Sequence, residues 1–261
     1  MEKVIAPATE PDKEWDIPIP DVSDLIIQDD MPVDNLQHEK QMRLLTEPLY
    51  GSWQVGRPFL VMANVGLFHE PKQTPVVPDV MLSLDVSLPP DWTEHKKHLS
   101  YFIWERGKGP DVVIEIVSDK RGGERSAKME HYAAIRIPFY VVFDTEHQIQ
   151  DDDLAVFVLV GDGYEPLPHP VFFKKLGIGL KLWHGTFEGV LTTWLRWADQ
   201  NGEVIPTGAE RAKTEQQRAE AERQRAGAEQ QRAEAERQRA DTAEARLAEL
   251  EARLKELQAQ Q

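Results

Sequence analysis

A single glutamate interrupts an otherwise apolar stretch of the sequence, from Val112 to Val117. Five of these six residues are apolar and fit a buried β-strand, and Glu115 is the exception. Removing an ionised carboxylate from water is costly, so such a group is usually retained only where a cation, a metal ion or several hydrogen-bond donors surround it. The sequence therefore predicts that the chemistry of this chain is centred on Glu115.

A second carboxylate and a lysine are candidate partners for this glutamate. Asp79 follows Pro78 at the beginning of another apolar segment, 36 residues before Glu115, and Lys128 follows Glu115 in a segment of helical character. Each residue also has a simpler interpretation. Asp79 could cap a turn, Glu115 and Lys128 could form a buried ion pair without turnover, and Lys128 could be a surface lysine with a packed stem.

The pattern around these candidates predicts strands that alternate with helices. Asp34 or Asn35 can cap the first helix. The order strand, helix, strand across residues 112–143 implies a parallel pair of strands joined by a right-handed crossover. The expected elements are a helix at 35–49, strands at 57–65 and 78–84, a long loop at 85–108, a central strand at 112–117, a helix at 124–135 and a strand at 139–143.

Two hairpins and a group of tryptophans are expected further along the chain. Gly161-Asp162-Gly163 separates the strand-like segments 154–160 and 164–167, and residues 199–202 separate 193–197 from 203–205. Trp183, Trp194 and Trp197 are expected to pack the domain rather than to stack on bases. His95 and His98 have a spacing that could hold a metal on a helix, but their neighbours favour an exposed loop.

The two ends of the chain differ from its middle. Residues 1–33 are rich in acidic residues and proline and predict an extended or disordered arm, whereas 34–206 predict one globular domain. Thr207-Gly208-Ala209-Glu210 is a capping box that opens a long charged helix over 207–261. A block of this helix repeats after 14 residues, and Leu247, Leu250, Leu254 and Leu257 follow in steps of three and four.

The leucine pattern supports a coiled coil only near the end of this helix. Projected backward, one leucine stripe falls on alanines and the other mostly on glutamates. A solvated charged helix held by Glu–Arg pairs is an equal alternative. If helical throughout, the segment would be roughly 75 Å long and could serve as a spacer, or join two copies of the chain or another partner.

Composition excludes several classes of function. The chain has 261 residues, no cysteine and a formal net charge of −15, so disulfides, thiolate zinc sites and cysteine nucleophiles are excluded, and tight DNA binding is disfavoured. No leader-like start and no membrane-spanning apolar run occur, so we expect a soluble cytoplasmic protein without membrane contact. Phosphate-binding, dinucleotide-binding and esterase motifs are also missing from the sequence.

Four segments taken in order resemble a known family. Pro78-Asp79-Val80, VVIEIVS at 112–118, SAKMEHYA at 126–133 and IPFYVVFD at 137–144 are similar to the restriction endonuclease family called Uma-two, in the PD-(D/E)XK nuclease superfamily. The resemblance covers about residues 34–205. It implies an α/β fold with a mixed sheet and a restriction-endonuclease-like core, here followed by a long C-terminal helix. Val117 stands where the superfamily has its lysine, and the resemblance implies that Lys128 has taken that role.

The resemblance also implies a metal-dependent reaction. Asp79, Glu115 and the backbone carbonyl of Ile116 would hold Mg²⁺ or Mn²⁺, and Lys128 would orient or deprotonate the nucleophile. The resulting activity would be that of a DNA endonuclease that hydrolyses phosphodiester bonds. Tyr132 and Asp144 match frequent family positions and are interpreted as structural supports. The alternative is an inactive nuclease-fold interaction protein that oligomerises or recruits partners through its C-terminal helix.

Overall fold

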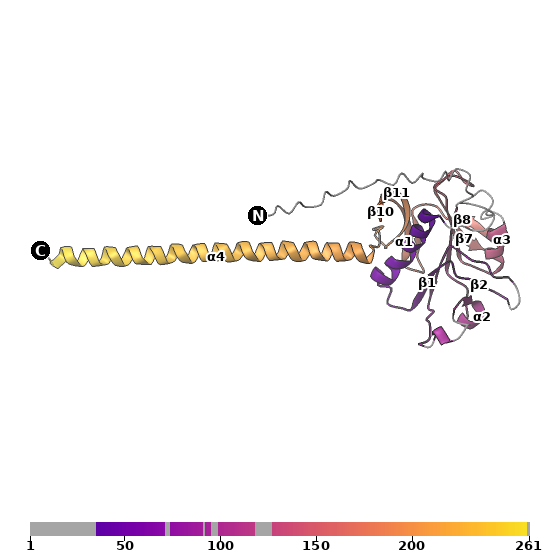
Figure 1. The fold of residues 1–261 in the computed structure, drawn as a ribbon, viewed down its shortest axis with the longest axis horizontal. Coiled ribbons are helices and arrows are strands. Elements are labelled where there is room, and N and C mark those ends of the chain that lie inside the picture. The colour runs from indigo at the N-terminus through magenta and orange to yellow at the C-terminus, as the bar shows by residue number, and fades with distance from the viewer. Residues whose placement is uncertain (1–34, 71–73, 91, 95–98, 118–126, 260–261) are drawn as a thin grey trace, which may run out of the picture.

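The computed structural model describes residues 35–259 except 71–73, 91, 95–98 and 118–126, and side chains as far as residue 255. The predicted arm at 1–33 and the pair His95 and His98 therefore lie outside the described residues. Figure 1 shows a body of sheets and helices from which one long helix extends.

In the described part of the chain, six strands form a mixed central sheet. Its order is β1-β3-β5-β6-β7-β8, in which β5 and β6 are parallel and the other neighbours antiparallel. This confirms the α/β class and the predicted parallel pair. The strands are β1 (Phe59–Ala63), β3 (Val80–Leu84), β5 (Val112–Ile116), β6 (Phe139–Phe143), β7 (Leu154–Val160) and β8 (Gly163–Pro166).

The two faces of the sheet pack into two separate cores. Because side chains alternate along a strand, Val112 and Ile114 of β5 join one core and Val113 and Val117 join the other. The first core includes the apolar side of helix α1 (Leu36–Ser52) and strands of a second sheet. The second core includes Tyr132 of helix α3 (Ala127–Ala134), which lies directly after the segment that follows β5.

Helix α1 is joined to a smaller three-stranded sheet made of β9 (Val171–Phe173), β10 (Ile178–Phe187) and β11 (Val190–Ala198). The buried Gln41 amide accepts from Leu195 N at 3.0 Å and donates to Leu195 O at 2.8 Å. Trp197 Nε1 donates to Leu45 O at 2.7 Å. These buried polar contacts fix the position of α1 against the sheets, because leaving either partner unsatisfied would be costly.

The tryptophan prediction is confirmed. Trp194 and Trp197 are buried, at 0% and 1% exposure, and Trp183 is partly buried beneath the Arg196 guanidinium, 4.9 Å from the ring centroid. The first hairpin is also confirmed, since β7 and β8 are joined by a turn at Gly161 and Asp162, with Val160 paired to Gly163.

The second predicted hairpin is present but short. Residues 203–205 turn back on the end of β11, with an antiparallel bridge between Ala198 and Val204 and hydrogen bonds from Asp199 N to Glu203 O at 2.8 Å and from Ile205 N to Trp197 O at 2.9 Å. Over its whole length β11 pairs with β10, a strand that the sequence analysis did not predict. The tight turn at Glu188 and Gly189, both with positive φ, makes this pairing possible. Glycines at 179 and 185 and the charged Lys181 weaken the apolar alternation of β10, which explains why its sequence does not predict a strand.

The expected loop at 85–108 also contains regular structure. A short 3-10 helix η1 (Trp92–Glu94) and helix α2 (Ile103–Arg106) lie within it. Strand β4 (Tyr101–Phe102) pairs in parallel with β2 (Leu67–Phe68). Strands of two residues are too short for a periodic sequence signal.

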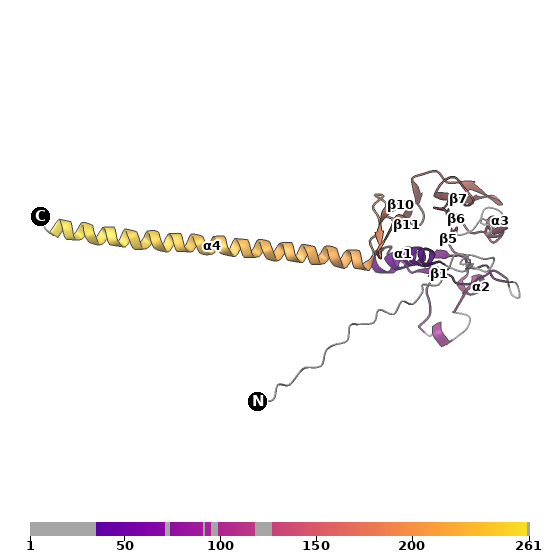
Figure 2. The ribbon, with the colours of Figure 1, turned by 45° about the horizontal axis from the view of Figure 1, so that its top comes forward.

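The long helix α4 (Gly208–Ala259) begins at the predicted capping box and extends away from the body in both views (Figures 1 and 2). Glu210 N donates to Thr207 Oγ1 at 3.1 Å, and Thr207 N donates to Glu210 Oε2 at 2.8 Å. The guanidinium of Arg196 in β11 donates to both oxygens of Glu210 at 2.8 and 2.7 Å. The first turn of α4 is therefore attached to the small sheet.

Candidate active site

Glu115 lies at the centre of the candidate site and is fully buried. It points toward α3, on the same face of β5 as Val113 and Val117. Lys128 Nζ donates to Glu115 Oε2 at 2.9 Å, and the Tyr132 hydroxyl donates to Glu115 Oε1 at 2.6 Å. Lys128 and Tyr132 are four residues apart on α3 and so lie on one helical face. The structure thus brings Lys128 to Glu115.

Asp79 lies directly before β3, the neighbour of β5. Val80 pairs with Ile114, so the antiparallel register places Asp79 opposite Glu115. Directly opposed residues of an antiparallel pair point to the same face of a sheet. Asp79 Oδ2 accepts a 2.6 Å hydrogen bond from Ile116 N. The predicted residues Asp79, Glu115, Ile116 and Lys128 therefore gather at one end of the strand pair.

Pro78 has a specific role in this arrangement. Extending the register of β3 and β5 by two residues places Pro78 opposite Ile116. A proline has no N–H group, so Pro78 cannot donate the ladder hydrogen bond that the Ile116 carbonyl would otherwise receive. The N–H of Ile116, which faces the same side, is satisfied by the Asp79 side chain instead. The Pro78-Asp79 pair thus ends the hydrogen-bond ladder between β3 and β5. It leaves the carbonyl oxygen of Ile116 directed toward Asp79.

The electrostatics of the site disfavour two ionised carboxylates. Burial, and after it the charge of Asp79, raise the pKa of Glu115 to about 8, against the lowering effects of Lys128 and of the Tyr132 hydrogen bond. Burial and the charge of Glu115 likewise raise the pKa of Tyr132 well above its ordinary value. Tyr132 therefore stays protonated and acts as a hydrogen-bond donor. The site lacks positive charge relative to its two acids.

His38 is a member of the site that the sequence analysis missed. Its Nε2 atom lies 3.2 Å from Asp79 Oδ1, and its side chain is 6% exposed. The side chain of Asn35, which caps α1, accepts from His38 N at 2.9 Å and so fixes the first turn. A signal was present in the sequence, because His38 occupies the apolar stripe of α1 formed with Met42, Leu45 and Leu49.

The donor set suits a hard divalent cation such as Mg²⁺. Among the described residues, no three His, Cys, Asp or Glu side chains gather closely enough to hold a metal ion. A cation here would therefore depend on Asp79, Glu115 and a backbone oxygen, with water in the other positions, which is the way Mg²⁺ is usually bound. The elevated pKa of Glu115 beside Asp79 supports this fit, because a cation would supply the charge that the pair lacks.

Asp144, at the end of β6, has a structural role as expected. Its carboxylate accepts backbone N–H bonds from Gln148, Ile149 and Gln150, at 2.9, 2.8 and 3.2 Å. It closes the turn that follows the strand.

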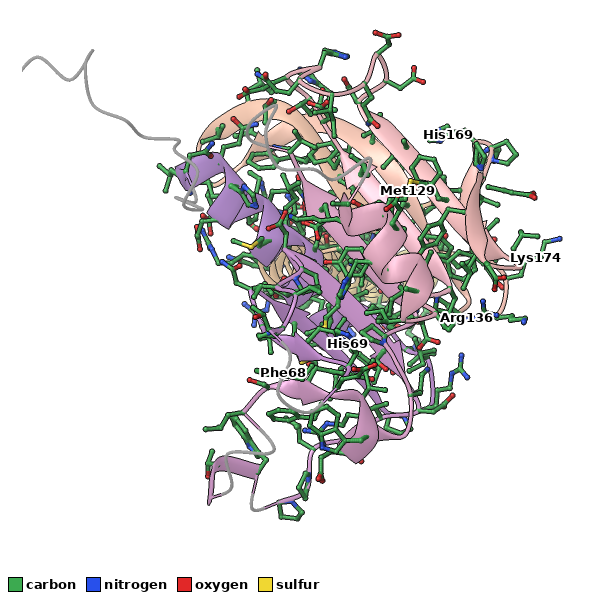
Figure 3. The ribbon with its side chains drawn as sticks, turned by 90° about the vertical axis from the view of Figure 1, so that its right-hand side faces the viewer. Phe68, His69, Met129, Arg136, His169 and Lys174 are labelled. Atoms are coloured by element: carbon green, nitrogen blue, oxygen red, sulfur yellow. The ribbon has the colours of Figure 1, made fainter. Side chains whose placement is uncertain are left out.

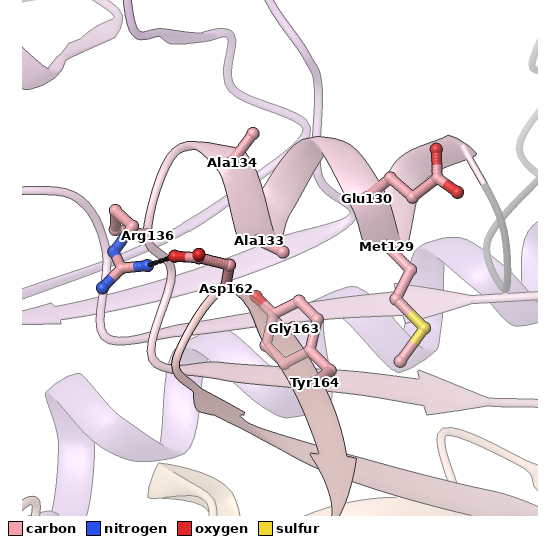
Figure 4. A pocket seen from close by; sticks show the side chains of 8 residues that line it. All are labelled: Met129, Glu130, Ala133, Ala134, Arg136, Asp162, Gly163 and Tyr164. Carbon is pink, nitrogen blue, oxygen red and sulfur yellow. Dashed lines mark hydrogen bonds and ion pairs between the residues drawn. The ribbon is translucent and has the colours of Figure 1, made fainter.

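A pocket on the other side of α3 is separate from the site. Met129, Glu130, Ala133 and Ala134 line it together with the turn and first residues of β8 (Figure 4). Lys128 and Tyr132 point from the same helix toward Glu115 instead. Figure 3 shows His69 beside α3, and its ring lies 4.9 Å from that of His131 of this helix.

The comparison with known protein families agrees with the motif series. Residues 22–176 match the family Uma2, described as "Putative restriction endonuclease". A crystal structure described as a "putative nuclease belonging to DUF820", from Anabaena variabilis, is similar with a TM-score of 0.38 and 13% identity, over 53% of this chain and 71% of that one. No curated protein matches the chain. The match over more than half of the sequence shows that this chain belongs to the Uma2 family of restriction-endonuclease-like proteins.

Proposed function

We propose that the protein is a metal-dependent endonuclease that hydrolyses phosphodiester bonds of DNA. Membership of a restriction endonuclease family supports a nuclease, and families of this kind generally use a divalent metal. The observation that carries the proposal is the meeting of an acid, an amine and a second acid from three separate segments of the chain. Lys128 Nζ is 2.9 Å from the fully buried Glu115, whose pKa is raised in part by Asp79.

Each residue then has a defined task. Asp79 and Glu115 would hold Mg²⁺ or Mn²⁺ together with the carbonyl of Ile116. The bound cation would supply Lewis acidity and lower the pKa of a coordinated water. Lys128 is 37% exposed, so its amine can contact Glu115 and still reach a water or a phosphate oxygen at the surface. Tyr132 keeps the Glu115 carboxylate in one orientation, and His38 does the same for Asp79.

The charge of the chain agrees with a cation-dependent contact to DNA. A protein with net charge −15 repels phosphate, so affinity must come from local positive charge. Lys128 and a bound divalent cation would provide it at the site itself. Binding should accordingly be weak without metal and should weaken further as salt is added.

One observation favours a second candidate function, an inactive interaction protein. Both oxygens of Glu115 already accept a hydrogen bond, from Lys128 and Tyr132, so the cluster can be satisfied as a structural ion pair. On that view, substitutions at Asp79, Glu115 and Lys128 would change stability, and added metal would change nothing.

Nicking of supercoiled plasmid DNA distinguishes the two functions. We expect conversion to the open-circular form with Mg²⁺ or Mn²⁺, none with EDTA, and a loss of at least 100-fold in Asp79→Asn, Glu115→Gln and Lys128→Met. Lys181→Met and Glu165→Gln, at exposed positions outside the site, are the matched controls and should cleave like wild type. Equal cleavage by wild type and the three site variants would indicate contamination and overturn the proposal, as would no cleavage of any DNA or RNA.

A further inference from the structure

The last turns of α4 expose an apolar stripe that has no partner within the described chain. Every described side chain of this helix after Glu210 is exposed. Leu247, Leu250 and Leu254 are 60%, 59% and 58% exposed, although they lie three and four residues apart on one side. A soluble helix with this pattern is expected to bury the stripe against another helix.

The heptad register limits where such a contact can form. If Leu247 and Leu254 occupy position a, then Leu250 and Leu257 occupy position d. The seam continues backward through Ala243 and Ala240, both small and apolar. Before that, position d is held by glutamates at 236, 229, 222 and 215. Burying a charged side chain at each of these layers is unfavourable, so the apolar seam begins at about residue 240.

The charges beside the seam identify the partner and its direction. Glu244 and Glu251 occupy position e, and Arg239 and Arg246 occupy position g. In a parallel pair of helices, each g residue faces the e residue five positions later on the partner, so each arginine would face a glutamate of a second copy. In an antiparallel pair, g faces g and e faces e, which places like charges together. The same sequence therefore complements itself only in the parallel orientation.

We propose that residues 239–258 form a parallel, in-register, two-stranded coiled coil with a second copy of this chain. Residues 208–238 stay apart, because the glutamates at position d repel each other and Arg232 at position g would face Arg237 of the second copy. Each body is thereby carried on a separate helical arm of about 45 Å. The proposal does not depend on nuclease activity.

Mass in solution tests whether the dimer exists. Light scattering on the full chain should give a concentration-dependent mass that approaches twice 29.8 kDa at micromolar to hundred-micromolar protein. The double variant Leu250→Glu and Leu254→Glu should remain a monomer throughout this range. Ala252→Glu, at the outward position f, should dimerise like wild type. A wild-type monomer at all concentrations, a trimer, or dimerisation that survives the leucine changes would overturn the proposal.

Cysteine cross-linking tests the direction and register. The chain contains no cysteine, so a single introduced cysteine reports only its own position. Ala243 lies at position d, where two parallel helices bring equivalent residues together, whereas Ala245 lies at position f and faces solvent. Under mild oxidation, Ala243→Cys should give a covalent dimer and Ala245→Cys should not. An antiparallel pair centred on the leucines would place the two copies of residue 243 at opposite ends, so failure of Ala243→Cys to cross-link would overturn the parallel arrangement.

Charge exchange tests the arginine–glutamate pairing. A chain with Arg239→Glu and Arg246→Glu places acidic residues at both e and g, and a chain with Glu244→Arg and Glu251→Arg places basic residues at both. Each variant alone should dimerise at least tenfold more weakly than wild type, and an equimolar mixture should form the mixed dimer. Unchanged self-association of either variant, or no preference for the mixed dimer, would overturn the pairing.

Discussion

The Nε2 atom of His38 lies 3.2 Å from Asp79 Oδ1, while the other Asp79 oxygen accepts the N–H of Ile116 at 2.6 Å. The carboxylate is thus held between the first turn of α1 and the end of β5. Helix α1 packs mainly on one face of the sheet, and Glu115 points to the other. Asp79 is therefore the point at which the two halves of the site meet.

We expect His38→Ala to weaken metal binding more than it weakens the fold. Removing a group that orients a ligand typically lowers metal affinity by about 10- to 100-fold. His38→Gln retains an N–H group that can reach Asp79 and should recover part of the loss. Isothermal titration with Mn²⁺, together with the metal concentration that gives half-maximal nicking, measures the effect. Equal metal affinity in wild type and His38→Ala would show that the histidine only packs.

Glu115→Gln should stabilise the metal-free protein at alkaline pH. A carboxyl whose pKa is about 8 in the fold and 4.5 when unfolded contributes stability that is complete below 4.5 and is lost as pH rises through about 8. Glutamine does not ionise and avoids this loss, which amounts to roughly 2–5 kcal/mol. Thermal melting from pH 5 to 9 in EDTA should show a widening difference in favour of the variant. A constant difference across this range would mean that Glu115 does not titrate there.

Metal binding should release a proton below about pH 8. A cation held as proposed would bind the ionised form of Glu115, so the apparent affinity should rise as pH increases from 6 to 8 and then level off. Titration in two buffers of different ionisation enthalpy counts the protons released. Asp79→Asn removes the charge that raises the pKa and should bind metal much more weakly. An affinity that does not change from pH 6 to 8 would contradict the predicted coupling.

Tyr132→Phe should shift the pH dependence of cleavage as well as reduce stability. The Tyr132 hydroxyl lowers the pKa of Glu115 through a 2.6 Å hydrogen bond. We expect activity to rise with pH as Glu115 ionises, and loss of the hydroxyl should move this rise to higher pH. Tyr164→Phe is the matched control, because its hydroxyl donates to Ile137 O at 2.8 Å, away from the acids. Both changes should lower the free energy of unfolding by about 1–3 kcal/mol, because each leaves a buried acceptor without its donor. A shift in the pH profile for both variants, or for neither, would contradict the assigned role.

The sequence predicted those parts of the site that lie on strongly apolar strands. The strands around Val112–Ile116 and Phe139–Phe143 are continuous apolar segments, and the glutamate within the first is conspicuous because its neighbours are buried. The register that places Asp79 opposite Glu115 follows from pairing of strands, which no single segment encodes. The sequence did not identify His38 as a site residue, because a histidine in an apolar helical stripe has the same spacing as a packing residue. Strand β10 was not predicted, because its glycines and charged residues obscure the two-residue period of apolar side chains that indicates a strand.

Breaking the contact between β11 and α4 should destabilise the whole body. Arg196 is 2% exposed, and both terminal nitrogens of its guanidinium donate to the Glu210 carboxylate. This contact lowers the pKa of Glu210. Glu210→Ala leaves a buried guanidinium without its counterion and also removes one half of the capping box, so we expect a loss of about 3–5 kcal/mol. Glu215→Ala removes an exposed ion pair in which the Glu215 carboxylate lies 3.9 Å from the Arg211 guanidinium. This change should lower the free energy of unfolding by less than about 1 kcal/mol. Urea unfolding followed by tryptophan fluorescence measures both, because Trp197 lies in the same sheet. Similar stability of the two variants would show that α4 begins independently of the body.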